Sequence, residues 1–369
     1  MADGDPTLRP DPAQESTRFG EGFLYNFWYL AAVSGELRAG LSERREILGE
    51  PVLLGRDGQG AVFALRDVCP HRAAPLSAGR LVRDPAGAEV VQCPYHGWLF
   101  RSGDGVCSLI PSLIDGQALD SERIAVRSYP VREAQGLVWI WMASDPRAAP
   151  EPDHEPVTFD GVVGGAPTLV DHMDFETHVD HAVVGLMDPT HGPYVHPQWW
   201  WRKSTTPKLK EKRFEPAELG FVMVRHAPSS NQRAYRLVGR PETEITFRLP
   251  GLRWEHVRAG GRQTLALTCL TPVTPTKTRI TQLIWSDHPL IGLLKPFVAY
   301  GARRFLRQDG ALVNLQNQGL KYDPSLLWID DADRQAKWYV ALKREWVSSR
   351  REDRAFRNPV QAMTLRWKS

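Results

Sequence analysis

The chain has 369 residues, a formal net charge of +3 and four cysteines. This length allows one large domain or two, each with ample core. The small charge argues against a nucleic-acid partner, and four cysteines are too few for a disulfide scaffold, which favours a reducing, cytoplasmic compartment.

The first 22 residues are polar and contain proline, without an apolar run behind a basic start. They predict a disordered arm rather than a signal peptide or a twin-arginine leader. No segment reaches 18 uninterrupted apolar residues, so we expect no membrane span. The closest, Pro289–Leu306, is interrupted by three basic residues and predicts a buried or amphipathic helix.

Short apolar runs follow, cut by glycines and charges: Phe27–Ala32, Glu46–Leu54, Ala61–Arg66, Glu89–Gln92 and Trp98–Phe100. Runs of this length predict strands joined by tight turns, with Asp57-Gly58 and Asp104-Gly105 as the clearest hairpin signals. Val131–Ala143 predicts a strand pair that closes this all-β unit.

Two motifs in this unit offer metal ligands. Cys69-Pro-His71 supplies a thiolate and an imidazole, and Cys93-Pro-Tyr-His96 supplies a second such pair. Two sulfur and two nitrogen ligands suit zinc, or a two-iron cluster whose second iron is bound by histidines. A zinc ribbon commonly uses Cys-x2-Cys pairs. Here each pair mixes Cys with His, and only one residue separates the two ligands of the first pair.

Each cysteine is followed by proline, and Gly97-Trp98 closes the second motif. The whole pattern resembles the ligand signature of Rieske [2Fe-2S] proteins. The resemblance implies that Cys69 and Cys93 bind one iron while His71 and His96 bind the other. Because two neutral imidazoles replace two thiolates, such a cluster has a reduction potential of about −150 to +300 mV and donates single electrons.

The proline-rich, charged stretch Ala148–Pro156 indicates a domain boundary near residue 150. Runs rich in β-branched or aromatic residues follow it: Phe221–His226, Glu244–Leu249, Thr264–Thr271 and Thr278–Trp285. They predict an α+β fold with an antiparallel sheet flanked by helices, the last over Asp330–Trp346. We therefore expect an arm (1–22), an all-β domain packed with chain-terminal helices (23–150) and an α+β domain (151–369).

The segment from Asp171 to His196 contains five histidines and four aspartates. A non-haem iron(II) site needs two histidines and one carboxylate on one face, which leaves the other face open for oxygen and substrate. Several pairs offer the histidines, including His178 with His181.

The preferred pair is His191 with His196, because Asp188-x2-His191-x4-His196 resembles the iron motif of the Rieske non-haem iron oxygenases. This family also carries the cluster signature, and the resemblance runs from about Phe27 to the helix after residue 300. It implies that His191, His196 and Asp309 bind a mononuclear iron. It also implies that Asp188 carries electrons between subunits by linking an iron histidine to His96 of a neighbouring subunit.

One departure from the family pattern lies beside this motif. An asparagine often found upstream of the bridging aspartate is missing, and Val184-Gly185 stand there instead. The departure removes no ligand, but it leaves open any contact that the asparagine makes near the iron or the substrate.

The resemblance implies a terminal oxygenase that hydroxylates or oxidatively demethylates a small hydrophobic, aromatic or polycyclic substrate, as in aromatic hydrocarbon catabolism. Electrons from NAD(P)H would arrive through a separate ferredoxin or reductase, because the chain shows no Gly-x-Gly-x-x-Gly nucleotide motif. A head-to-tail homotrimer would bring neighbouring sites together. Ring dihydroxylation stays open, as do a Rieske electron carrier with a non-catalytic ligand-binding domain and a zinc-stabilised structural protein.

Other residues have no assigned ligand role. His172, His178 and His181 are expected to be hydrogen-bonded structural residues, with Asp180 orienting one of them. Trp199-Trp200-Trp201 walls a pocket or packs in the core, and the basic run Arg202–Arg213 predicts an exposed loop. The substrate cavity is expected to be apolar.

Overall fold

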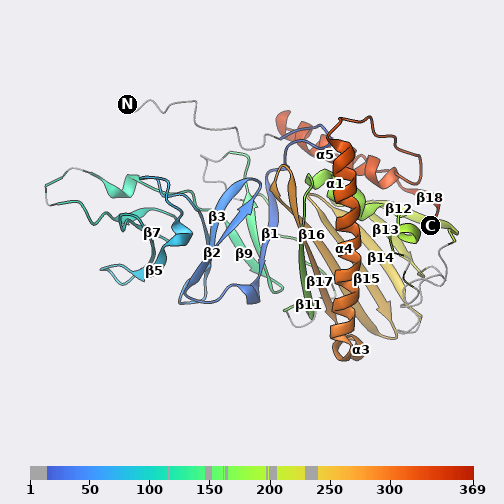
Figure 1. Ribbon diagram of the computed structural model, residues 1–369, viewed down its shortest axis with the longest axis horizontal. Helices are drawn as coiled ribbons and strands as arrows, with labels where there is room; N and C mark the ends of the chain where they lie inside the picture. The colour runs from blue at the N-terminus through green and yellow to red at the C-terminus, as the bar shows by residue number, and fades with distance from the viewer. Residues whose placement is uncertain are drawn as a thin grey trace. The chain divides into compact units, whose positions relative to one another are not determined.

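The computed structural model describes residues 15–369 except 115, 118, 146–151, 161, 163–164, 197, 199–205 and 229–239. The predicted boundary near residue 150 and Trp199-Trp200-Trp201 therefore lie outside the described residues. Two compact units are present (Figure 1). Unit 1 spans residues 25–158, and unit 2 combines residues 15–24 with residues 159–369.

Unit 1 is all-β, as predicted, and contains three antiparallel sheets with the orders β1-β10-β9, β2-β3-β4 and β5-β6-β7-β8. Its strands are β1 (Phe27–Val33), β2 (Leu41–Ile47), β3 (Glu50–Arg56), β4 (Val62–Arg66), β5 (Arg80–Arg83), β6 (Glu89–Gln92), β7 (Leu99–Arg101), β8 (Cys107–Leu109), β9 (Val131–Ala134) and β10 (Leu137–Met142). Short 3₁₀ turns lie at Ser34–Glu36, Leu76–Ala78 and Ser121–Arg123.

One predicted strand of unit 1 is wrong. The run Glu46–Leu54 is split between β2 and β3, because Leu48 and Gly49 both adopt positive φ angles of 54° and 74°. Two consecutive residues with positive φ form the kind of tight turn that connects two antiparallel strands. Leu-Gly is not a usual sequence for this turn, so the apolar run concealed it.

Unit 2 is built on an eight-stranded antiparallel sheet in the order β11-β17-β16-β15-β14-β13-β12-β18. Its strands are β11 (Leu169–Phe175), β12 (Leu209–Ala217), β13 (Gly220–His226), β14 (Glu242–Arg248), β15 (Leu252–Ala259), β16 (Arg262–Thr274), β17 (Lys277–Ser286) and β18 (Met363–Lys368). Its helices are α1 (Val179–Met187), α2 (Gly192–Val195), α3 (Pro289–Leu293), α4 (Lys295–Leu320) and α5 (Arg334–Arg351).

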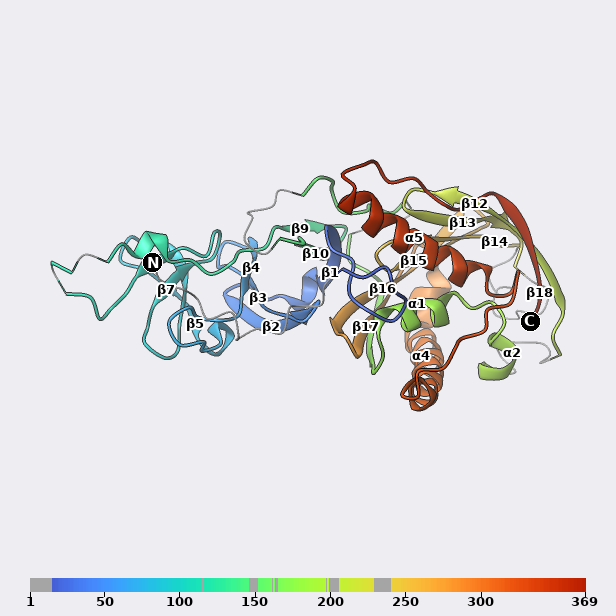
Figure 2. The ribbon, with the colours of Figure 1, turned by 90° about the horizontal axis from the view of Figure 1, so that it is seen from above.

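The α+β prediction is confirmed, with helices α1, α4 and α5 on one side of the curved sheet (Figure 2). Trp338 and Tyr339 of α5 pack on aromatic rings of β12 and β14, such as Phe214 and Phe247. The C-terminal helix begins at Arg334 and ends at Arg351, later at both ends than predicted. Among the described helices, none combines the length and apolar character that crossing a membrane requires.

Residues 15–22 differ from the predicted disordered arm, because they are fixed on unit 2. Asp180 Oδ2 accepts hydrogen bonds from Gly20 N at 2.7 Å and from Lys343 Nζ at 2.6 Å. Lys343 Nζ also donates to Glu21 O at 2.8 Å, and both charged side chains are 1% exposed. Breaking a buried pair of this kind costs about 3–5 kcal/mol, so these polar contacts fasten the segment to α1 and α5.

Candidate metal centres

Two loops of unit 1 present the four predicted cluster ligands. In the first, Cys69 N donates to Ala74 O at 2.9 Å; in the second, Cys93 N donates to Trp98 O at 2.8 Å. Gly97 closes the second loop with a φ of +72°, a conformation that glycine adopts without strain. Each loop is thus shaped by backbone bonds that span only five residues.

The structure brings the two cysteines together and the two histidines together. Both cysteines are 2% exposed and belong to the core of the unit, whereas His71 and His96 are exposed. The two imidazole centroids lie 4.5 Å apart, and His71 stacks on Trp98 at 4.6 Å with an interplanar angle of 7°. Two buried sulfurs and two exposed imidazoles are the donor set that a Rieske cluster would need.

Burial, helped by the neighbouring Cys93, raises the pKa of the Cys69 thiol to about 11 against the opposing effect of the backbone amides of His71 and Arg72. A thiol with this pKa is protonated at neutral pH without metal, and metal binding deprotonates it. The same two amides point at the sulfur and would stabilise the thiolate.

In unit 2, His191, His196 and Asp309 gather within ligand distance. Their donor atoms lie within 4.8 Å of one another. His191 Nε2 is 3.3 Å from His196 Nε2, and Asp309 Oδ1 is 3.1 Å from His196 Nε2 and 3.7 Å from His191 Nε2.

This triad fits one metal ion. Two ligand atoms that are each about 2.1 Å from an ion, at angles of about 90 to 110°, lie about 3.0 to 3.4 Å apart. Two of the three observed separations fall in this range and the third is slightly longer. Two histidines and one carboxylate on one side of an ion, with open positions opposite, are typical of non-haem iron(II).

Long-range packing assembles the triad. His191 and His196 flank the short helix α2, whereas Asp309 lies on α4. Helix α4 approaches β11 closely at Gly310, where an added Cβ would meet Phe175 at 3.1 Å and Met173 at 3.4 Å. Because Gly310 has no side chain, α4 can lie close to β11, and this position places the neighbouring Asp309 beside the two histidines.

Neighbouring polar groups orient the triad. His196 Nδ1 lies 3.0 Å from Gln308 Oε1, which also accepts a bond from Gln198 Nε2 at 2.7 Å. Since that oxygen can only accept, the imidazole must donate through Nδ1, which leaves its Nε2 free to bind metal. Sequence reasoning missed Gln308, and its position beside Asp309 was the only signal.

Asp188 lies at the edge of the triad. Its Oδ1 accepts bonds from Thr190 N at 2.7 Å and Thr190 Oγ1 at 2.6 Å, and its Oδ2 is 3.5 Å from His191 Nδ1. Burial by itself would raise the pKa of Asp188, but the nearby His191 ring and the bonds from Thr190 outweigh it and hold the pKa below its usual value. The carboxylate therefore stays charged beside a histidine of the triad.

A cavity of about 270 Å³ adjoins the triad. Its lining includes His191 and His196, together with apolar side chains such as Met223 and Ile245. The expectation of an apolar cavity is only partly met, because Lys210, Lys212, Arg253 and Glu255 also line it. The first two belong to the run predicted as an exposed loop, whose residues 209–213 instead form part of β12.

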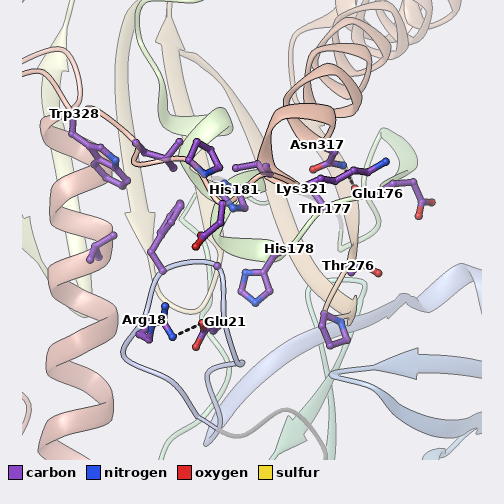
Figure 3. Close-up of a pocket in the computed structure, with 18 of the residues that line it drawn as sticks. Arg18, Glu21, Glu176, Thr177, His178, His181, Thr276, Asn317, Lys321 and Trp328 are labelled. Atoms are coloured by element: carbon purple, nitrogen blue, oxygen red, sulfur yellow. Dashed lines mark hydrogen bonds and ion pairs between the residues drawn. The ribbon is translucent and has the colours of Figure 1, made fainter.

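A larger cavity of about 1090 Å³ contains none of the predicted ligands (Figure 3). It lies between residues 18–21 and helices α1, α4 and α5, and it is lined by His178 and His181. His178 Nε2 is 3.0 Å from Gly22 O, and its Nδ1 accepts from Asp180 N at 3.2 Å. The remaining histidine, His172, is hydrogen-bonded to Thr281 Oγ1 at 3.0 Å. All three histidines lie outside the metal triad.

Comparison with known proteins identifies the cluster domain. A family model for the Rieske [2Fe-2S] domain matches residues 27–130. The chain is 39% identical over 183 residues to the oxygenase component of dicamba O-demethylase from Stenotrophomonas maltophilia, covering 47% of this chain and 48% of that protein. It is 38% identical over 175 residues to the toluene-4-sulfonate monooxygenase system iron-sulfur subunit TsaM1 from Comamonas testosteroni, covering 47% of each.

The chain spans about half or less of the length of the curated relatives that it matches. The structural likeness extends further. The crystal structure of dicamba monooxygenase bound to dicamba matches with a TM-score of 0.71 and 25% identity, over 90% of this chain and 99% of that one. The chain therefore carries a Rieske [2Fe-2S] domain, is similar in sequence to oxygenase components over about half of its length, and shares the fold of dicamba monooxygenase over most of it.

Proposed function

We propose that this protein is a terminal oxygenase component that uses O2 to hydroxylate or oxidatively demethylate a small organic substrate with an aromatic or polycyclic body. The observation that carries the proposal is the triad of His191, His196 and Asp309 beside a cavity. An electron carrier has no use for a second metal site of this kind. The relatives named as a demethylase and a monooxygenase support the same reaction class.

Each unit has its own task in this proposal. Cys69, His71, Cys93 and His96 of unit 1 hold the cluster, which supplies single electrons, and the unit 2 triad holds the iron, which supplies oxygen activation. In a hydroxylation, one atom of O2 enters the substrate and the other leaves as water, so two electrons and two protons are consumed. Gln308 orients His196, and Thr190 fixes Asp188.

The electrons need partners. They come from NAD(P)H through a separate ferredoxin or reductase, because the chain shows no nucleotide-binding motif of its own. As in the family that the two motifs resemble, His96 of one subunit then passes electrons to Asp188 of the next subunit. The subunits form a homotrimer, which is located in the cytoplasm. The charged carboxylate of Asp188, held beside an iron histidine, suits it to this link.

A test of the proposal begins with the purified holoprotein. Iron and acid-labile sulfide are counted, the electron spin resonance spectrum is recorded, and O2 uptake coupled to NADH is measured with a surrogate reductase and a panel of aromatic substrates. A cluster together with one further iron per chain and substrate-dependent O2 uptake is the expected result. A cluster without the additional iron would support an electron carrier, and a colourless zinc protein would contradict both.

The proposed route is tested by Asp188→Asn. This change keeps the size of the side chain and removes its charge, so both metals should stay bound while turnover stops. Rapid-mixing reduction of the cluster should proceed as in the wild type, since Asp188 lies in the other unit. Undiminished turnover in this variant would show that electrons reach the iron by another path.

A further inference from the structure

Trp98, which follows Gly97 in the second cluster loop, lies against a predicted ligand of the first loop. Its indole ring stacks on the His71 imidazole, with the ring centroids 4.6 Å apart and an interplanar angle of 7°. Its carbonyl oxygen accepts a hydrogen bond from Cys93 N at 2.8 Å. The side chain also packs against the core cluster that contains both ligand cysteines. Trp98 is thus fixed by contacts with ligands from both loops.

The indole N–H of Trp98 is buried and has no hydrogen-bond acceptor among the residues that the structure describes. Neither the Cys69 nor the Cys93 sulfur accepts it. The face of the His71 ring does not accept it either, because in a parallel stack the N–H bond runs alongside that face instead of toward it. A buried donor without an acceptor costs free energy, so this N–H needs an acceptor from outside the protein chain.

A second tryptophan in unit 1 shows that the arrangement of the neighbouring rings matters. The indole N–H of Trp141 is also buried without an acceptor. Its neighbours Trp28 and His154 are steeply inclined to it, at 62° and 75°, and a ring face across an N–H is a weak acceptor. The aromatic neighbours of Trp98 are the parallel His71 ring and Phe100, which is 6.5 Å away at 34°. Neither ring stands across the N–H of Trp98.

A Rieske cluster would bring acceptors of its own to this place. The family model for such a domain covers residues 27–130, and the two cysteines and two histidines fit the cluster. Two inorganic sulfides join its irons, and hydrogen bonds to the cluster sulfurs help to set its reduction potential. His71 would bind the iron that shares these sulfides, and Trp98 is the ring stacked on His71. The sulfides are therefore acceptors suited to this donor.

We infer that the indole N–H of Trp98 donates a hydrogen bond to a bridging sulfide of the cluster and thereby raises the reduction potential of the cluster. Reduction adds one negative charge, so a donor to the sulfide stabilises the reduced form more than the oxidised form. The indole keeps its proton in both redox states, and the cluster accepts one electron from its external donor. The inference concerns the Rieske domain alone and does not depend on the proposed oxygenase reaction.

The substitution Trp98→Phe separates the N–H from the stacked ring. The phenyl ring keeps an aromatic face for His71 but lacks the donor, so the midpoint potential of the purified holoprotein should fall. We expect an equilibrium constant for reduction that is about tenfold smaller, which corresponds to about 59 mV for one electron. A redox titration followed by visible absorbance measures the potential, and iron and sulfide contents verify that the cluster is bound.

Trp141→Phe is the matched control for this substitution. It removes another buried indole N–H from the same unit, but one whose aromatic neighbours are Trp28 and His154 instead of a cluster histidine. Its midpoint potential should equal that of the wild type. An equal fall in both variants would reflect a general loosening of unit 1 and would overturn the inference.

A second measurement detects the hydrogen bond without any substitution. The protein is produced with tryptophan that carries nitrogen-15 in its indole ring, and pulsed electron spin resonance is recorded on the reduced cluster. A nitrogen that is hydrogen-bonded to a sulfide should show magnetic coupling to the electron spin through that bond. Trp98→Phe should remove this coupling, whereas Trp141→Phe should retain it.

The two measurements together decide between a hydrogen bond and stacking alone. A lowered potential, with a coupling that is lost only in Trp98→Phe, is the expected result. Absence of the coupling in the labelled wild type would overturn the inference, even if Trp98→Phe failed to bind a cluster. A lowered potential without that coupling would show that stacking, and not the N–H, sets the potential. Neither measurement uses O2 or substrate, so failure of the proposed oxygenase reaction would leave both results unchanged.

Discussion

The two candidate metal centres are built in opposite ways. In unit 1 the ligands lie on two loops whose shapes are set by hydrogen bonds such as Cys69 N to Ala74 O, a few residues away. In unit 2 the His196 ring and its partner Gln308 are 112 positions apart in the sequence, and only the packing of α4 brings them together. A site defined by local bonds persists when distant parts of the chain loosen, whereas a site defined by packing does not. We therefore expect the triad to be the more vulnerable centre.

The largest effect that separates the two centres is expected from Asp309→Ala. Removing the carboxylate deletes one of three ligands, so iron equivalent to one ion per chain should be lost and turnover should fall about 10³-fold or more. Sulfide content and the visible spectrum of the cluster should not change. Gln316→Ala, at an exposed position of the same helix, is the control and should behave as the wild type. Retention of the iron by Asp309→Ala would show that another residue is the third ligand.

A smaller loss is expected from Gln308→Leu, which removes the acceptor that orients His196. Changes of this kind typically cost 10–100-fold in metal affinity. Iron(II) affinity is measured by competition with a chelator, and Gln308→Glu, which keeps an acceptor at the same place, should restore most of it. If Gln308→Leu bound iron as tightly as the wild type, packing alone would suffice to orient the imidazole.

The dependence of the triad on packing is tested by Gly310→Ala. The new methyl group meets Phe175 on β11, and overpacking of this kind costs about 1–3 kcal/mol in the free energy of unfolding. Gly319→Ala is the matched control on the same helix, because open space surrounds it, and it should be neutral or stabilising by up to about 1 kcal/mol. Thermal unfolding is followed together with the absorbance of the cluster, so that the stabilities of the two centres are compared in one experiment. Equal effects of the two substitutions would contradict the close approach at Gly310.

The smallest effect concerns pH. Burial lowers the pKa of His178 and His181 in unit 2, and the charge of Lys343 lowers both further. An unfolded histidine has a pKa of about 6.5, so between that value and the lower folded pKa the unfolded chain binds more protons. The stability of unit 2 should thus be complete above about pH 6.5 and decline as the pH falls below it. His181→Gln should reduce this decline, as measured by unfolding midpoints at pH 7.5 and 5.5, and an unchanged acid slope would rule His181 out as a contributor.

The same contrast explains what the sequence could predict. The cluster ligands were found because short motifs carry them, and the loops fold around those motifs. Strands β1, β4, β13 and β17 were found within a residue or two because their runs contain β-branched or aromatic residues that favour strands. His191 and His196 also belong to one motif, whereas Asp309 was accessible only through the family resemblance, since nothing local distinguishes it from a solvated helix residue.

The failures occurred where polar residues have structural partners that the sequence does not show. Strand β11 was not predicted, because Asp171 and Asp174 interrupt its apolar pattern; the structure pairs them with Arg303 and Arg279. Strand β12 reads as a basic loop, although its alternation of exposed and half-buried residues is that of a strand. Lys210 and Lys212, which line the cavity beside the triad, were therefore assigned to an exposed loop.

The segment of residues 15–24 gives the chain a discontinuous order of assembly. A ribosome releases this segment before unit 1, and the rest of unit 2 after unit 1, so Gly20 emerges 160 residues before its partner Asp180, and Glu21 emerges 322 residues before Lys343. Unit 1 can fold as soon as it is synthesised. Unit 2 can be completed only after α5 has been synthesised, because Lys343 of that helix then binds Glu21 and Asp180.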